Sequence, residues 1–295
     1  MLGKRLIASF AMITPMLLLL WLDTQRNGGT PGIWSVPVIV LASVVIAGEL
    51  MAMTSESTSG AIPWVAYVGS FLCHLAVASP EILQGIGSPQ IANRWLIVSA
   101  ALAIVLGAAF GNELMRFQGD RPSTAHIALT MFVVLYSGWL LCFLTATRLE
   151  LENYKGVVAL FSILFIIKMS DAGAYFAGKN LGKRKLAPVL SPGKTIEGLV
   201  GGVVAALFAG WFVFAVVQRQ LLPDAPVNWL AVIGYALSIC LVGVAGDLCE
   251  SLIKRDMGCK DSSGWLPGLG GIMDTADSVL LAAPVAYLWW VSGLL

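Results

Sequence analysis

Charged residues are scarce in this chain. Asp, Glu, Lys and Arg make up 12% of its 295 residues, whereas soluble globular domains carry about 25%. Hydrophobic residues reach 58%, and the mean hydropathy is +0.83. The formal net charge is only +1, which excludes the strongly basic surface that nucleic-acid-binding domains present. The composition predicts a membrane protein without a nucleic-acid partner.

Cysteine and histidine are too few and too scattered for two common kinds of site. The five cysteines include no C-x-x-C pair, so the sequence indicates neither a zinc site nor a disulfide framework. The histidines, His74 and His126, lie far along the chain from the densest group of charged residues. Chemistry in that group therefore has to proceed without an imidazole base.

Long apolar runs are what the chain does have. A helix crosses the hydrocarbon of a bilayer with about 20 mostly apolar residues. Nine such runs are predicted, over residues 6–22, 33–53, 61–79, 95–112, 126–146, 156–177, 198–218, 229–252 and 279–295. The first is longer than the apolar core of a signal peptide, and no small-x-small cleavage site follows it, which favours a membrane span. We therefore expect an all-α, polytopic membrane helix bundle of about nine transmembrane helices.

The basic residues predict the orientation of this bundle. With nine spans and a cytoplasmic N-terminus, most of the 18 Lys and Arg residues fall in cytoplasmic segments, as the positive-inside rule requires. An even number of spans would place one of the two basic loops, 178–197 and 253–278, outside. We expect a multi-pass protein of the inner cell membrane whose active site faces the cytoplasm.

The ionisable residues also divide the chain. The N-terminal part, 1–147, holds spans one to five, and the C-terminal part, 148–295, holds spans six to nine with both basic loops. Glu49, Glu113 and His74 of the N-terminal part are interpreted as interfacial or hydrogen-bonded side chains without a catalytic role. The catalytic residues are therefore expected in the C-terminal part.

The densest group of charges begins near the end of the eighth apolar run. Asp247, Ser251 and the basic pair Lys254 and Arg255 recur at helical spacing, which places a carboxylate, a hydroxyl and cations on one stripe of a helix. Burying such groups at a membrane boundary is costly, so they generally mark function. The stripe predicts a polar site at the end of this helix.

Further acids follow the stripe. Asp261 lies in the connecting loop, and Asp274 and Asp277 are three residues apart where the last run begins, a place at which a helix N-terminus favours negative charge. Mg²⁺ is commonly held by carboxylates together with substrate phosphates. Paired acids without a Cys or His cluster predict Mg²⁺ or Mn²⁺ and not zinc. Gly270 and Gly271 of the preceding turn would let backbone amides approach anionic oxygens.

The other basic loop carries a predicted anion site. Ser191 and Pro192 are typical of an N-cap and the first residue of a helix, so the amide-bearing end of the seventh span would lie beside Lys194. A Gly-Lys-Thr sequence ending at Thr195 imitates a P-loop, but Pro188 stands where that motif requires glycine. The neighbouring cations could also anchor the loop to acidic lipid. The two interpretations are compatible.

Together these segments resemble the phosphatidate cytidylyltransferases, also called CDP-diacylglycerol synthases. The strings that carry the resemblance are Asp171-Ala-Gly-Ala-Tyr175, Ser191-Pro-Gly-Lys194-Thr195-Ile-Glu-Gly, Gly-Asp247-Leu-Cys-Glu-Ser251-Leu-Ile-Lys254-Arg255, Lys260-Asp261-Ser and Pro-Gly-Leu-Gly270-Gly271-Ile-Met-Asp274-Thr-Ala-Asp277. The resemblance implies a homodimeric enzyme of the lipid bilayer that makes CDP-diacylglycerol and pyrophosphate from CTP and phosphatidic acid.

The resemblance also implies roles for individual residues. Asp247 and Asp274 match the acids of the family's metal centre, where a second metal ion is an open alternative. The remaining catalytic residues would be Lys254, Arg255, Lys260 and Asp261. Substrate binding would involve Asp171, Tyr175, Ser191, Lys194, Thr195, Ser251, Gly270, Gly271 and Asp277.

Two positions depart from the family pattern. Leu269 stands where the family has His, and Thr275 stands where it has Arg. Each replacement removes a group that could donate to a phosphate. Three alternatives therefore stay open: another CTP-dependent lipid enzyme (a CDP-ether or isoprenoid lipid synthase, or a lipid kinase), an inactive relative, or a cation-binding transporter, which would place its acids at mid-membrane in broken helices.

Overall fold

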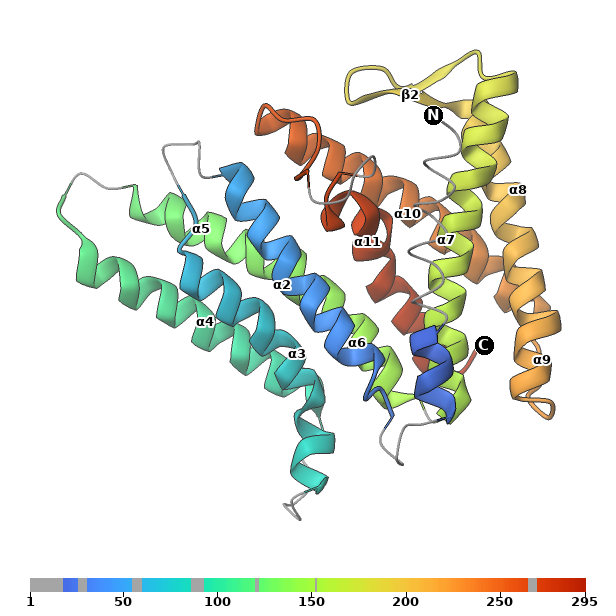
Figure 1. Cartoon of the computed structure of the whole chain (residues 1–295), viewed down its shortest axis with the longest axis horizontal. Coiled ribbons are helices and arrows are strands. Elements are labelled where there is room, and N and C mark those ends of the chain that lie inside the picture. Colours follow the sequence, from blue (N-terminus) through green and yellow to red (C-terminus); the bar gives the residue numbers. More distant parts are fainter. Residues whose placement is uncertain are drawn as a thin grey trace.

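The structure is a computed structural model, and it is almost entirely helical (Figure 1). The residues that it describes are 18–25, 31–54, 60–85, 93–119, 122–151, 153–264 and 270–295. Backbone hydrogen bonds within a helix satisfy the polar groups of the main chain, which hydrocarbon cannot do. An apolar chain of this kind therefore folds as a helix bundle.

The N-terminal part contributes four long helices. They are α2 (Ser35–Thr54), α3 (Pro63–Gly85), α4 (Arg94–Arg116) and a continuous helix formed by α5 (Ser123–Val133), the π-helical turn η1 (Val134–Trp139) and α6 (Leu140–Glu150). A short helical segment over 18–25 precedes them.

The C-terminal part contributes α7 and the elements that follow it. They are α7 (Asn153–Leu181), a hairpin of β1 (Lys185–Ala187) and β2 (Ser191–Thr195), a continuous helix formed by α8 (Ile196–Phe212), η2 (Val213–Val217) and α9 (Gln218–Leu221), then α10 (Trp229–Asp256) and α11 (Ile272–Val291).

Seven helices among the described residues are long and apolar enough to cross a membrane. They coincide with predicted spans two to eight, so the all-α polytopic bundle is confirmed. The ninth predicted span corresponds to α11, which begins at Ile272 and is not one of the seven. The first lies mostly outside the described residues. The count of nine and the cytoplasmic N-terminus stay predictions.

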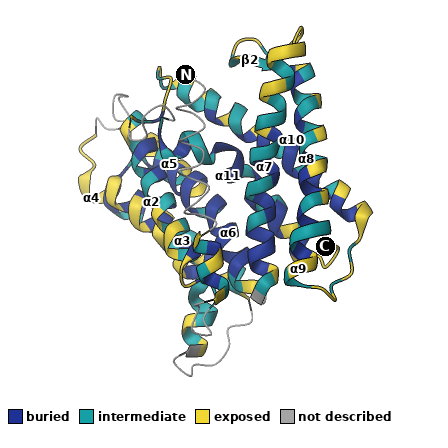
Figure 2. Ribbon diagram, turned by 45° about the vertical axis from the view of Figure 1, so that its right-hand side comes forward, coloured by how far each residue is buried: buried dark blue, intermediate teal, exposed yellow. Residues whose placement is uncertain are grey.

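α11 lies at the centre of the bundle. It packs against α10 and α7 of the C-terminal part and against α6 and α2 of the N-terminal part (Figure 1). Buried residues gather along these contacts, whereas the outer faces of α3, α4 and α8 are exposed (Figure 2). The hairpin and the connection from α10 to α11 lie at the same end of the bundle, which we call the loop end. The two basic loops therefore meet on one side.

The hairpin corrects one prediction. Ser191 is not an N-cap and Pro192 does not begin a helix, because Ser191–Thr195 is a strand that pairs antiparallel with Lys185–Ala187. Thr195 caps α8 instead: its Oγ1 accepts a hydrogen bond of 3.0 Å from the Gly198 amide. Proline lacks a donor and fits an edge strand as well as a first helical turn. Pairing with Lys185 and Ala187 decides between the two.

Candidate active site

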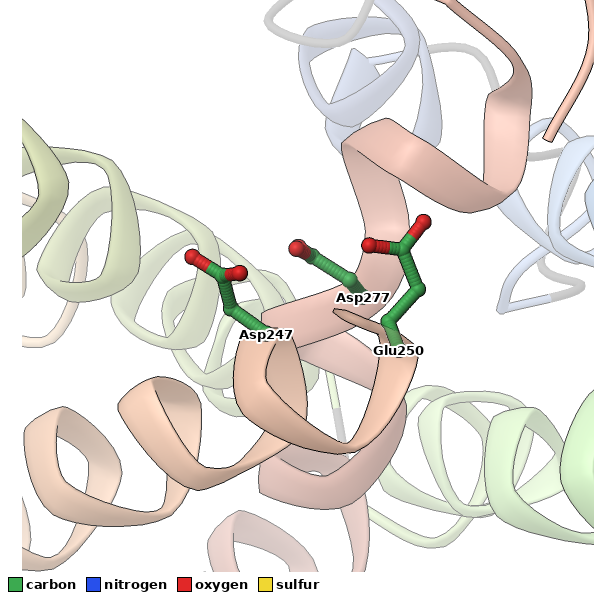
Figure 3. A group of neighbouring side chains, drawn as sticks. All are labelled: Asp247, Glu250 and Asp277. Atoms are coloured by element: carbon green, nitrogen blue, oxygen red, sulfur yellow. The ribbon is translucent and has the colours of Figure 1, made fainter. Parts of the chain in front are cut away.

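Three carboxylates meet at the loop end. Asp247 and Glu250 belong to α10 and Asp277 to α11, and one oxygen of each lies within 4.8 Å of the others. Figure 3 shows all three groups on one side of α10, with Asp277 between the other two in this view. We call this group the acidic cluster. A Cβ at Gly246 would lie 2.6 Å from the Asp277 carbonyl oxygen, so glycine there lets the two helices approach closely enough to form it.

Two lysines from other elements stand beside the cluster. Lys194 of β2 forms an ion pair of 2.7 Å with Asp247. Lys168 of α7 lies 3.8 Å from Asp171 and donates a hydrogen bond of 3.2 Å to the Thr275 carbonyl. A cation within a membrane helix is costly without a partner or a function. These lysines therefore bring positive charge close to Asp247 and to the first turn of α11.

Lys254 joins the cluster to Asp274. Its Nζ lies 2.7 Å from Glu250 Oε2 and 2.6 Å from Asp274 Oδ1. The other oxygen of Glu250, Oε1, is buried and has no hydrogen-bond partner within the described part of the chain. One oxygen of Glu250 is therefore paired with a lysine, and the other oxygen is open, without a partner among the described residues. An unpaired buried oxygen of this kind can accept a hydrogen bond or bind a cation.

Asp274 itself is saturated with donors. Its Oδ2 accepts hydrogen bonds from the Ser262 amide at 2.9 Å and the Gly271 amide at 2.6 Å, and it shares the single proton of the Ser262 hydroxyl, 2.8 Å away, with Glu49. Burial by itself raises the pKa of the Asp274 carboxyl, but hydrogen bonds from the Gly271 amide, Lys254 and the Ser262 amide outweigh burial and lower the pKa. Asp274 is thus a fixed anion that closes the loop onto the first turn of α11.

The loop also depends on α2 of the N-terminal part. Glu49 is 6% exposed and accepts hydrogen bonds from Ser262 and Ser263 of the loop and from the first amides of α11. This side chain is therefore hydrogen-bonded, which is one of the two interpretations drawn from the sequence, and the connection between α10 and α11 encloses it.

A pocket of 650 Å³ adjoins the acidic cluster on the side of α7 and α8. Several predicted site residues line it, namely Asp171, Tyr175, Ser191, Lys194, Thr195 and Asp247. The structure thus brings residues of one basic loop, 178–197, together with residues of α7 and α10 at one cavity. Its size is within the range of about 300–1,000 Å³ typical of small-molecule sites.

The other predicted residues are distributed around this centre. Ser251 is partly buried on α10, and Arg255 donates to the Cys259 carbonyl at 3.3 Å. Lys260 and Asp261 are exposed at the loop surface. Gly270 and Gly271 face Asp274 and Glu49, which leave no room for a side chain at either position. Leu269 lies outside the described residues.

Sequence reasoning missed three residues of this site. Glu250 lies three positions after Asp247 on α10, so helical spacing was a usable signal for it. Lys168 was noticeable as a cation within an apolar run. Glu49 carried no such signal, because its partners lie more than 200 positions away in the chain.

The acidic cluster fits a hard divalent cation. Three carboxylates this close repel one another unless a positive charge lies between them. Their oxygens are the ligands that Mg²⁺ and Mn²⁺ prefer. The open oxygen of Glu250 adds to this fit. The predicted pair, Asp247 and Asp274, is arranged differently: Asp247 belongs to the cluster, and Asp274 is linked to it through Lys254.

Comparison with known proteins agrees with the motifs. The model of the cytidylyltransferase family matches residues 3–292. A phosphatidate cytidylyltransferase of Staphylococcus aureus (strain COL) is 31% identical over 85% of the chain and 94% of its own length. An Escherichia coli protein named uncharacterized protein YnbB is 29% identical over 97% of each chain. A phosphatidate cytidylyltransferase of Haemophilus influenzae is 39% identical over 46% of the chain, and the match spans 49% of that relative.

These matches confirm the resemblance drawn from the motifs. The family model covers nearly the whole chain, the match to the Haemophilus influenzae enzyme spans only about half of that relative, and the Staphylococcus aureus enzyme aligns along almost all of its length. The chain belongs to the cytidylyltransferase family, within the group of the phosphatidate cytidylyltransferases.

Proposed function

We propose that this chain transfers CMP from CTP to phosphatidic acid and releases pyrophosphate, which yields CDP-diacylglycerol for phospholipid synthesis. The observation that carries the proposal is the acidic cluster, which adjoins a pocket lined by Lys194 at the loop end of a membrane bundle. Relatives that bear the name phosphatidate cytidylyltransferase support the same substrates.

The reaction requires little acid or base chemistry. A phosphate oxygen of the lipid attacks the α-phosphorus of CTP, a new P–O bond forms, and the bond from the α-phosphorus to the oxygen bridging the β-phosphorus breaks. The pyrophosphate departs with that electron pair. Because the lipid phosphate is already ionised near neutral pH, no strong base is needed. Catalysis then depends on alignment of the two substrates and on neutralisation of phosphate charge.

A divalent cation would be held by Asp247, Glu250 and Asp277. Bound there, Mg²⁺ or Mn²⁺ neutralises phosphate oxygens and orients the triphosphate. Asp274, which the sequence paired with Asp247, would support this set through Lys254. A second metal ion remains part of the proposal.

The lysines complete the charge balance. Lys194 pairs with Asp247 in the lining of the pocket, and it would be free to bind a phosphate if that carboxylate held a metal ion. Lys168 presents its ammonium group near the start of α11. Both are positioned to bind the triphosphate or the lipid headgroup as point charges. Tyr175, exposed on α7, is available to the nucleotide.

The setting of the reaction is part of the proposal. Phosphatidic acid resides in the bilayer and CTP in the cytoplasm, so the substrates meet only at a membrane surface. The loop end gathers both basic loops, which supports a cytoplasmic orientation in the inner membrane under the positive-inside rule. We include a homodimer as the working assembly.

The departures at 269 and 275 favour one second candidate, a CTP-dependent enzyme acting on another lipid. Thr275 contributes only a hydroxyl, which donates to the Gly271 carbonyl at 3.3 Å. A transporter fits less well, since α10 runs unbroken from Trp229 to Asp256 through two of the acids. A lipid kinase would transfer the γ-phosphate of CTP, and an inactive relative would transfer nothing.

A product assay tests these candidates together. Membranes containing the chain receive phosphatidic acid or other lipid acceptors, with CTP labelled on the α- or on the γ-phosphate. Our proposal expects the α-label in a CDP-lipid from phosphatidic acid, only when Mg²⁺ or Mn²⁺ is present. Transfer of the γ-label would indicate a kinase, and no product with any acceptor would contradict the proposed reaction.

A further inference from the structure

Glu49 connects the N-terminal helices to the loop between α10 and α11. It lies near the end of α2 and is 6% exposed. Its Oε1 accepts hydrogen bonds from the Ser263 hydroxyl at 2.7 Å and the Ile272 amide at 3.0 Å. Its Oε2 accepts from the Ser262 hydroxyl at 3.0 Å and the Met273 amide at 2.8 Å. Both oxygens of one carboxylate are therefore shared between the loop and the following helix.

The hydrogen bonds from the Ile272 and Met273 amides to Glu49 cap the start of α11. Ile272 and Met273 are its first residues, and the first amides of a helix have no partner within the helix. A carboxylate at that end also interacts favourably with the helix dipole. Gly271, the N-cap residue, offers no side chain of its own, and a Cβ there would lie 2.5 Å from Glu49. Glu49 thus caps α11 from another helix.

The contacts lead from Glu49 directly to the acidic cluster. The Ser262 hydroxyl that contacts Glu49 also lies 2.8 Å from Asp274, and Asp274 binds the lysine that neutralises Glu250. Asp277 stands one helical turn beyond the capped amides of α11. The start of α11, which brings Asp277 to α10, is therefore held by a residue of the N-terminal part.

We propose that Glu49 is a positioning residue of the active site, which sets the loop and the start of α11 so that Asp277 meets Asp247 and Glu250. The part of this inference that concerns turnover rests on the proposed function, whereas the part that concerns metal binding does not. It assigns a role in catalysis to the N-terminal part of the chain, from which no catalytic residue was expected.

Glu49→Gln is the most specific test of this role. The shape of the side chain is kept, but its single oxygen can serve only one pair of donors and its amide group faces the other pair. A serine hydroxyl can turn and accept from that amide group, whereas a backbone N–H cannot. Glu49→Gln therefore leaves one of the two amides, Ile272 or Met273, without an acceptor.

The matched control is Glu113→Gln on α4. Glu113 is equally buried at 5% exposure, and its Oε1 and Oε2 lie 3.5 Å from Asn112 and 3.3 Å from His126, both in the N-terminal part. This control separates the loss of a buried negative charge from the loss of the contacts with α11. Ser263→Ala, which removes one donor to Glu49, tests the same link with a smaller change.

The experiment measures Mn²⁺ binding by electron paramagnetic resonance and turnover with CTP and phosphatidic acid, on purified protein in lipid nanodiscs. We expect Glu49→Gln to weaken Mn²⁺ binding by about 10- to 100-fold, as loss of a supporting partner does at metal sites, and to lower kcat. Ser263→Ala should show a smaller shift of the same kind and, combined with Glu49→Gln, less than the sum of the two effects.

Wild-type Mn²⁺ affinity in Glu49→Gln would overturn the inference, and so would an equal loss in Glu113→Gln. If Glu49→Gln fails to fold, Ser263→Ala decides: an unchanged affinity overturns the inference and a weakened one supports it. A wild-type protein that binds Mn²⁺ but makes no CDP-lipid would refute the proposed function, while the binding series would still test Glu49.

Discussion

Substituting Asp277 and Asp274 in turn separates two assignments of the metal ligands. The sequence and the resemblance assign Asp274 to the metal together with Asp247, whereas the geometry places Asp277 with Asp247 and Glu250. Asparagine is the appropriate replacement at both positions, because it keeps the size of the side chain and removes its charge. The two positions lie one helical turn apart on α11.

The expected magnitudes differ because the two side chains have different partners. Loss of a supporting group around a metal costs about 10- to 100-fold in affinity, so removal of a direct ligand in Asp277→Asn should raise the Mg²⁺ half-saturation by about 100-fold or more. The amide oxygen of the new side chain in Asp274→Asn can still accept from the donors that Oδ2 has in the wild type. Its NH₂ group then faces Lys254, so the hydrogen bond from Lys254 is lost. One hydrogen bond to a charged group is worth about 1.5–3 kcal/mol.

At 1.4 kcal/mol for each factor of ten, loss of that bond corresponds to about a 10- to 100-fold lower kcat in Asp274→Asn. Its Mg²⁺ half-saturation should rise by about tenfold at most. The assay is initial-rate CDP-lipid formation at saturating CTP over a Mg²⁺ titration. The reasoning is refuted if Asp274→Asn shifts the Mg²⁺ dependence more than Asp277→Asn does, and full activity in Asp274→Asn would remove any role for this residue.

Three further predictions concern other parts of the molecule. Arg148→Met should destabilise the fold by about 3–5 kcal/mol, because it strands the carboxylate of Asp23, which lies 2.9 Å from Arg148 with both side chains buried; an unchanged unfolding midpoint in detergent would contradict this. Lys194→Met should raise the KM for CTP more than it lowers kcat, and the reverse pattern in steady-state kinetics would exclude a binding role. Leu269→His combined with Thr275→Arg should raise the rate on phosphatidic acid, and no gain in the product assay would indicate a site adapted to a different lipid.

The features that local periodicity determines were predictable. Apolar runs of the length of a bilayer gave spans two to eight, and the spacing of Asp247, Ser251 and Lys254 placed a polar stripe on α10. Glu250 fits the same spacing and could have been included. These predictions succeed because a helix fixes the relation between neighbours three and four positions apart whatever the rest of the fold does.

The features that depend on distant partners were not predictable. Ser191 and Pro192 suit both a helix start and an edge strand, and only pairing with Lys185–Ala187 decides between them. The choice between Asp274 and Asp277 as neighbour of Asp247 depends on how α11 is rotated against α10, which the spacing of acids in one helix does not specify. Glu49 contacts residues as far as 224 positions away.

The acids around the loop between α10 and α11 have two different roles. Asp274 is already bonded to Lys254 and to two backbone amides and has little capacity left for a cation, whereas the open oxygen of Glu250 retains it. Asp274 and Glu49 therefore hold the backbone through their hydrogen bonds, and the acids of the cluster keep more capacity to bind a divalent cation. Glu49 and Asp274 bind the amides at the start of α11, and α11 carries Asp277 to the acids of α10. In this way Asp274 and Glu49 keep the three carboxylates of the acidic cluster close together despite their mutual repulsion.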